Sequence, residues 1–133
     1  MSTQRPVLIM QLPEQLDALG AQMFMQELES LFDSQHPRII FDCSAIRYMD
    51  GVGVEMMHHC LEEVRKRDGD LKLAALSPEA QVVLELMRDA RVFDTFATSD
   101  DAVHSFRSLP ATRVKVSSHA HLDGESRILK KAS

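Results

Sequence analysis

The stretch of sequence that decides the fold is Arg38-Ile-Ile-Phe-Asp-Cys-Ser-Ala-Ile-Arg-Tyr-Met-Asp-Gly-Val-Gly-Val54. Its first part, Arg38 to Cys43, is short and apolar on both faces, which is typical of a central strand covered by helices on either side. A brief connection, Ser44 to Asp50, leads to residues 52–67, where apolar side chains recur at helical spacing. That stripe consists of Met57, Cys60, Leu61 and Val64. The pattern predicts a buried strand followed by an amphipathic helix.

The same alternation continues on both sides of this stretch. Further strands are expected at residues 5–12, 71–76 and 93–97. Further helices are expected after Asp17, after Ser77 with Pro78 at the first helical position, and after Ser99. The first of these helices has its apolar stripe at Ala21, Phe24, Leu28, Leu31 and Phe32, and Ser34 to Pro37 should end it. Four strand–helix alternations with short connections predict one α/β domain with a mostly parallel, four- to five-stranded sheet and four helices.

Charge divides the chain into an acidic body and a basic end. The whole sequence of 133 residues has a net charge of −5. Residues 111–133 contribute +3, which leaves −8 for residues 1–110, the predicted domain. The basic tail is expected to be flexible or to pack on a neighbour, and the alternation in Val114-Lys-Val116 leaves an edge strand open as a further possibility. An acidic body argues against nucleic-acid binding, which depends on neutralised phosphates.

The composition indicates a soluble cytoplasmic protein. No apolar run approaches the roughly 20 residues of a membrane helix. The apolar stretch from Val7 to Met10 is too short for the core of a signal peptide. In a reducing compartment Cys43 and Cys60 are expected to be free thiols buried by packing.

Patterns that would indicate catalysis, metal binding or a cofactor are incomplete. Gly51-Val52-Gly53 lacks the third glycine of a dinucleotide-binding turn, since Met56 stands there. His58 and His59 are adjacent on a helix and point about 100° apart, so they cannot share one ion. No Gly-x-Ser-x-Gly nucleophile motif is present. The sequence therefore predicts no enzyme, no metal site and no cofactor.

The stretch quoted above resembles the signature of the bacterial anti-sigma factor antagonist (STAS) family. That signature is an apolar strand, an Asp-containing connection, and an aromatic and an apolar residue before Asp-Ser-x-Gly at a helix start. The resemblance extends over about residues 6–110. It includes Leu12 to Asp17, Asp68 to Leu73, Leu76 to Glu79, Phe93 and Ser99 to Ala102. It implies the STAS fold and a regulatory, protein-binding function in transcription signalling.

In the family that the sequence resembles, the serine after the motif Asp is phosphorylated by a partner kinase that is also an anti-sigma factor. The unmodified protein binds that partner, and phosphorylation breaks the complex. Here Gly51 occupies the serine position, so phosphorylation is not expected there. Ser44, in the preceding loop, is interpreted as a turn residue.

The resemblance thus implies a docking site at the helix start that lacks the usual switch. The partner-binding residues expected from it are Asp50, Gly51, Val52, Gly53, Met56 and His59, with the last two and Val52 as the exposed face. A simpler interpretation is compatible with docking: the glycines permit a tight helix entry and Asp50 is its N-cap.

Three functions stay open at this point. The first is binding to an anti-sigma factor/serine kinase as an antagonist. The second is an accessory subunit or scaffold in a transporter or sensor complex. The third is a small-ligand or nucleotide sensor that uses the helix start from Gly51 to Gly53, since a helix N-terminus attracts anions. A homodimer is also left open as a partner.

Overall fold

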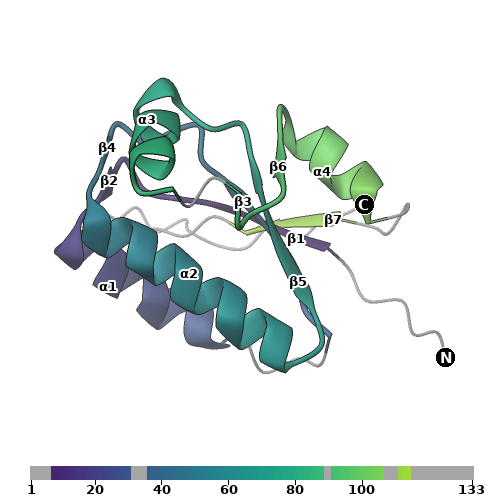
Figure 1. Cartoon of the computed structure of the whole chain (residues 1–133). Coiled ribbons are helices and arrows are strands. Elements are labelled where there is room, and N and C mark those ends of the chain that lie inside the picture. The colour runs from purple at the N-terminus through teal and green to yellow at the C-terminus, as the bar shows by residue number, and fades with distance from the viewer. Residues whose placement is uncertain (1–6, 31–35, 89–90, 107–110, 115–133) are drawn as a thin grey trace, which may run out of the picture.

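The computed structural model describes residues 7–30, 36–88, 91–106 and 111–114 (Figure 1). Within these ranges the helices are α1 (Ala18–Glu29), α2 (Gly51–Lys66), α3 (Pro78–Leu86) and α4 (Ser99–Ser105). The strands are β1 (Val7–Gln11), β2 (Gln15–Leu16), β3 (Arg38–Asp42), β4 (Tyr48–Met49), β5 (Asp70–Ala74), β6 (Thr95–Phe96) and β7 (Ala111–Val114). The predicted alternation of four strands with four helices is confirmed, and β2, β4 and β7 are additional to it.

Five strands form one parallel sheet in the order β6-β5-β3-β1-β7. In its centre Val7 of β1 pairs with Arg38 of β3, which pairs with Asp70 of β5. Each of these connections crosses over through a helix, as parallel pairing requires. The predicted α/β class, with a mostly parallel sheet of four to five strands and four helices, is therefore confirmed.

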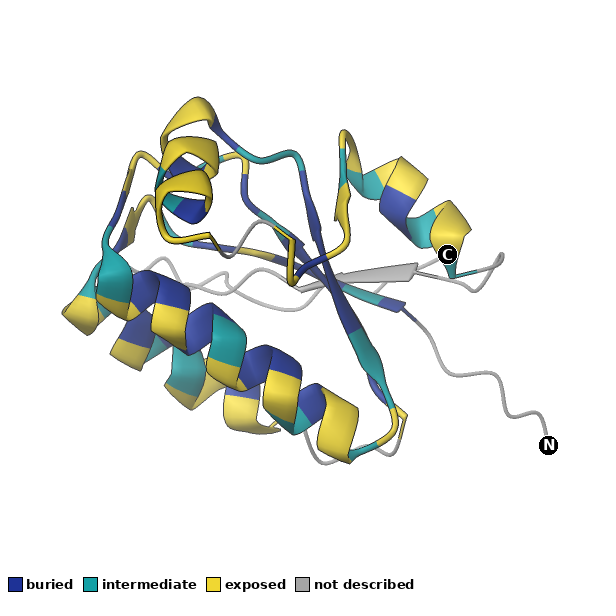
Figure 2. Ribbon diagram, viewed as in Figure 1, coloured by how far each residue is buried: buried dark blue, intermediate teal, exposed yellow. Residues whose placement is uncertain are grey.

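The two faces of the sheet are covered unequally (Figure 1). Helices α1 and α2 lie side by side over one face, whereas α4 lies over the other. The larger core lies under α1 and α2, where the rings of Phe24 and Phe41 meet edge to face with centroids 5.3 Å apart. The smaller core joins Val7, Ile9 and Ile40 to α4. Figure 2 shows the resulting pattern, with buried residues along the inner sides of the helices.

Lys72 is the charged exception on the α4 face of the sheet. Its ammonium lies 4.7 Å from the ring centroid of Phe106 and 5.4 Å from that of Phe96. It also lies 3.6 Å from Asp70 Oδ2 and 3.5 Å from Asp94 Oδ2. Cation–π contacts and two carboxylates together compensate for the burial of this side chain.

A second, two-stranded sheet was not predicted. β2 pairs with β4 in parallel, with Gln15 opposite Tyr48 and Leu16 opposite Met49. Strands of two residues carry no detectable periodicity, so local sequence could not indicate this pairing. The pair matters for function because it holds the residues just before α1 beside those just before α2.

Several predicted boundaries require correction. The N-cap of α4 is Thr98, whose hydroxyl accepts from Asp101 N at 3.0 Å, and Ser99 is the first helical residue instead. The strand expected at residues 93–97 shortens to β6, because only Thr95 and Phe96 pair with β5, and Phe93 is buried ahead of the strand. α1 ends at Glu29, and the expected helical residues Leu31 and Phe32 lie outside the described residues.

The sheet continues beyond residue 110. Ala111 to Val114 form β7, which pairs in parallel with β1, so Val7 lies opposite Ala111 and Met10 opposite Val114. An edge strand is thus present, as was left open, but over Ala111 to Val114; of the alternating residues 114–116 only Val114 lies among the described residues. The rest of the basic tail, residues 115–133, lies outside the described residues.

Candidate functional site

Asp50 opens α2 as its N-cap, as expected. Its backbone is extended (φ −124°, ψ −172°), and its Oδ1 accepts from Val52 N at 3.1 Å and Gly53 N at 3.2 Å. These two amides would otherwise lack partners at the helix start. Met49, one residue earlier, is buried and paired in β4, so the cap is held by the small β2–β4 sheet.

Gly53 is required by close packing. A Cβ at this position would collide with the carbonyl oxygen of Leu16 and would lie 3.0 Å from Leu16 Cγ and 3.2 Å from Leu16 C. Leu16 is fully buried and paired in β2, so its backbone has little freedom to retreat. Gly53 therefore lets the first turn of α2 lie against the backbone of β2.

Gly51 is not required by packing. A Cβ there would lie 3.6 Å from Met87 Cε and 3.9 Å from Met87 Sδ, which is ordinary van der Waals contact. The residue follows directly on the Asp50 cap and begins the helix. A small side chain such as that of serine or alanine fits at this position, although the chain has none there. The interpretation that both glycines permit a tight entry thus holds for Gly53 and not for Gly51.

The surface around Gly51 is apolar. Tyr48, Val52 and Met87 are 48, 46 and 42% exposed, although all three are large hydrophobic residues. Met87 reaches Gly51 from the C-terminal end of α3, and α3 packs against β4, which carries Tyr48. We call Tyr48, Gly51, Val52 and Met87 the helix-start surface. Clustered exposed apolar side chains commonly mark interaction sites.

Two of the expected contact residues are not on this surface. Met56 is only 7% exposed, because it belongs to the main core and its sulfur lies 3.5 Å from Cys60 Sγ, so its placement on the exposed face was wrong. Gly53 is buried against Leu16. His59 is exposed two turns after Val52, and Glu55 rather than Met56 lies between them on the exposed side of α2.

The sequence interpretation missed Met87. It lies far from Gly51 in the chain, and its spacing from Val83 is that of a helical core stripe, so its position in the sequence favours the buried side of α3. No local signal distinguishes a core methionine from one at the edge of the core. Tyr48 was part of the recognised motif, but its exposure depends on the β2–β4 pair.

Ser44 forms a turn, as expected. Its backbone N donates to Asp42 Oδ1 at 3.0 Å, and its hydroxyl donates to the same oxygen at 2.7 Å. This is the geometry of an Asx turn, in which a carboxylate completes the bend after a strand. The serine is therefore accounted for by the turn between β3 and β4.

Both cysteines are free and buried, as expected. Burial, and secondarily the charge of Asp42, raises the pKa of the Cys43 thiol. Burial, and secondarily the charge of Glu63, raises the pKa of the Cys60 thiol to about 12. Both groups are therefore neutral thiols at neutral pH, which makes them poor nucleophiles.

Among the described residues, no three His, Cys, Asp or Glu side chains are grouped so that they could hold a metal ion. His58 instead stacks edge to face on Phe93, with ring centroids 5.7 Å apart. Of the helices described, none has the length and apolar character needed to cross a bilayer.

Comparison with known proteins identifies the family of this domain. The family model of the STAS domain matches residues 1–102. The chain belongs to the STAS domain family. The family resemblance found in the sequence is thereby confirmed. In this STAS domain the last residues of the signature form the start of α2. No curated protein matches the chain.

Two solved structures share the fold of this STAS domain. An anti-sigma factor antagonist (STAS) domain protein from Planctomyces limnophilus is 15% identical, with a TM-score of 0.68, over 75% of this chain and 90% of that one. A protein from Thermotoga maritima described as a candidate anti-sigma factor antagonist is 17% identical, with a TM-score of 0.67, over 74% of this chain and 87% of that one. At these identities the likeness concerns the fold.

Proposed function

We propose that this STAS domain is an anti-sigma factor antagonist-like regulator. It binds a protein partner, an anti-sigma factor that is also a serine kinase, through the helix-start surface, with Asp50 and His59 at its margins. It acts by docking rather than by catalysis. The observation that carries the proposal is the exposure of Tyr48, Val52 and Met87 around the capped start of α2.

Apolar side chains at this place have a physical use. Burying three half-exposed hydrophobic residues against a partner contributes favourable free energy on the order of 25 cal/mol per Å² of apolar surface. Because Gly51 has no side chain, the partner's backbone can approach the first turn of α2 closely. The two similar structures support the proposal, since both are described as antagonists of anti-sigma factors.

We further propose that docking is not controlled by phosphorylation at position 51. Glycine has no hydroxyl, and Ser44 already donates its hydroxyl to Asp42, where a phosphate would meet a carboxylate. A phosphate adds about −1.5 to −2 charges, so a phosphate on Ser44 would be repelled by the carboxylate of Asp42. The complex is therefore expected to persist in the presence of ATP.

The test uses the serine-kinase anti-sigma factors of the source organism, purified and mixed with the full chain and ATP. The wild-type chain should bind one of them and acquire no phosphate by intact-mass measurement. Gly51→Ser, which the packing accommodates, should bind and then become phosphorylated on residue 51. Gly51→Asp should fold and lose binding, since it places a second carboxylate beside Asp50.

Phosphate on Ser44 of the wild-type chain would refute the proposal that docking lacks a phosphorylation switch. Binding that is unchanged by Gly51→Asp would show that the interface lies elsewhere. Capture of a transporter or sensor subunit, with no binding to any of these kinases, would favour the accessory-subunit function instead.

A further inference from the structure

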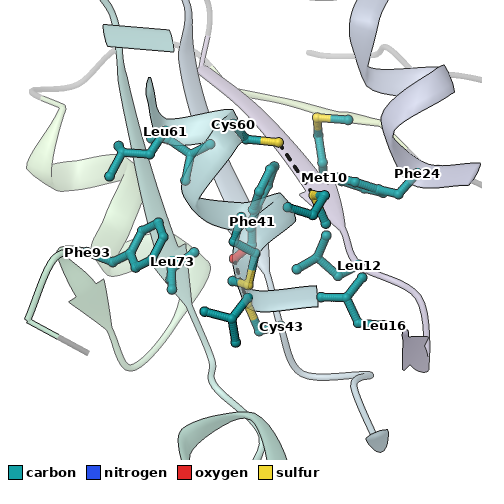
Figure 3. Close-up of a cluster of buried hydrophobic side chains, with 14 of the residues drawn as sticks. Met10, Leu12, Leu16, Phe24, Phe41, Cys43, Cys60, Leu61, Leu73 and Phe93 are labelled. Carbon is teal, nitrogen blue, oxygen red and sulfur yellow. Dashed lines mark hydrogen bonds between the residues drawn. The ribbon is translucent and has the colours of Figure 1, made fainter. Parts of the chain in front are cut away.

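Three sulfur atoms converge between α1 and α2, away from the helix-start surface. The Sγ of Cys60 lies 3.4 Å from the Sδ of Met25 and 3.5 Å from the Sδ of Met56. Met56 and Cys60 stand one turn apart on α2, and Met25 comes from α1. Figure 3 shows Cys60 among the buried side chains of the main core, with a dashed line from its thiol to another sulfur atom. The Cys60 thiol can thus donate its one hydrogen to either of two thioether sulfurs.

We propose that this cluster is a binding site for a soft monovalent metal ion, Cu(I), with a Cys60 thiolate and the thioethers of Met25 and Met56 as ligands. Thiolate and thioether sulfur are the ligand types that select Cu(I). Binding exchanges one cation for another: the Cys60 S–H bond breaks, the S–Cu bond forms and a proton leaves to solvent. No electron is transferred.

The two distances from the Cys60 sulfur are compatible with one shared ion. A metal–sulfur bond is about 2.3 Å, so two sulfurs on the same ion lie at most about 4.6 Å apart. Both sulfur–sulfur distances are shorter than this limit. Three sulfurs around one ion at this bond length stand about 4 Å apart. The two thioethers must therefore move about 0.5 Å away from the Cys60 sulfur, which small rotations about the flexible methionine side chains permit without separating the helices.

The charge of the site selects a monovalent ion. One thiolate, two neutral thioethers and Cu(I) sum to zero, so the occupied site is neutral like the protonated one. A divalent ion such as Zn²⁺ would leave a net positive charge among apolar side chains, which is costly. Cys60 and Met56 are buried, whereas Met25 is half-buried at the seam between α1 and α2, where an ion can enter.

The expectation that the chain has no metal site was based on its histidines and cysteines. The sulfur set could not be found that way, because Met25 joins the other two residues only through the packing of α1 on α2. The site is independent of partner docking at the helix start.

The test is an anaerobic titration of the reduced full chain with Cu(I) in competition with bathocuproine disulfonate. The wild-type chain should bind one equivalent, and X-ray absorption should show sulfur ligands at about 2.3 Å. Cys60→Ser should lose this binding. Met25→Leu and Met56→Leu, which conserve volume, should each weaken it on the order of tenfold or more.

Matched controls separate the cluster from the other sulfur atoms. Cys43→Ser removes the other buried thiol, and Met57→Leu changes a buried methionine that points about 100° away from Met56 on α2. Both should bind as the wild type does. Cu(I) affinity that is retained in Cys60→Ser, or unchanged in a folded Met25→Leu variant, would overturn the proposal. Failure of the wild type to compete with the chelator would overturn it equally.

Discussion

Alanine at the two glycines of the α2 start should affect stability in opposite directions. At Gly53 the added Cβ lies within the contact distance of Leu16 O and 3.0 Å from Leu16 Cγ. To relieve this overlap, α2 must move from β2, and overpacking of this kind costs about 1–3 kcal/mol. Because the main overlap is with a paired backbone carbonyl, we expect the upper part of that range for Gly53→Ala.

At Gly51 the added Cβ only makes ordinary contact with Met87, at 3.6 Å from its Cε. Alanine restricts the unfolded chain more than glycine does, which stabilises the folded state by about 0.4–1 kcal/mol where the backbone is compatible. Gly51→Ala should therefore be neutral or stabilising. The two variants make the same chemical change two residues apart, so each is the control of the other.

Urea and thermal denaturation followed by far-UV circular dichroism measure the free energy of unfolding and the melting temperature of both variants. One kcal/mol corresponds to about 4 °C in melting temperature for a domain of this size, so Gly53→Ala should melt about 8–12 °C below the wild type. A Gly53→Ala variant as stable as the wild type would refute the close approach of α2 to β2. A Gly51→Ala variant destabilised by more than about 1 kcal/mol would refute the open space at residue 51.

Three further outcomes are expected. Asp50→Ala should lower the free energy of unfolding by about 1 kcal/mol, since two amides of α2 lose their acceptor. In the same urea titration Asp50→Asn should retain most of that stability, and equal losses in both variants would contradict a capping role. Cys43 and Cys60 should resist a thiol reagent at pH 8 in the native protein and react in denaturant; fast native labelling of either would contradict their burial. The folded state raises the pKa of both thiols, so their contribution to the free energy of unfolding is complete below about pH 9 and is lost as the pH rises further. Melting curves from about pH 7 to pH 11 should therefore show a decline in melting temperature, and this decline should be smaller in Cys60→Ser.

Local signals determined most of the fold in advance. The strand β3 and the helix α2 follow from apolar periodicity within single segments, and the caps Asp17, Asp50 and Ser77 follow from short-range chemistry at helix starts. Thr98 and Ser99 are adjacent and both suit an N-cap, so the choice between them depends on how α4 packs. Prediction from the sequence was least accurate at the ends of helices and strands, where a shift of one residue changes the boundary.

The candidate site was predicted only in part, because its surface is assembled from separate segments. Asp50 to Gly53 could be found from the motif, but Met87 joins Gly51 through the packing of α3. Met56 was assigned to the wrong side of α2, since a stripe pattern does not fix how wide the buried side is when a second helix lies alongside. Such contacts across helices carry no signal in a single sequence.

The β2–β4 pair places the two helix starts in register: Leu16 lies opposite Met49, and the next residues on each side, Asp17 and Asp50, are both N-caps. Two positive helix ends thus stand next to each other, and each is neutralised by its own carboxylate. An incoming phosphate would meet two fixed negative charges, with the amides of Gly20, Val52 and Gly53 already occupied. The amides that could bind an anion at this end of the molecule are therefore occupied by the protein's own carboxylates, which counts against a nucleotide ligand there and agrees with the proposed docking of a protein partner.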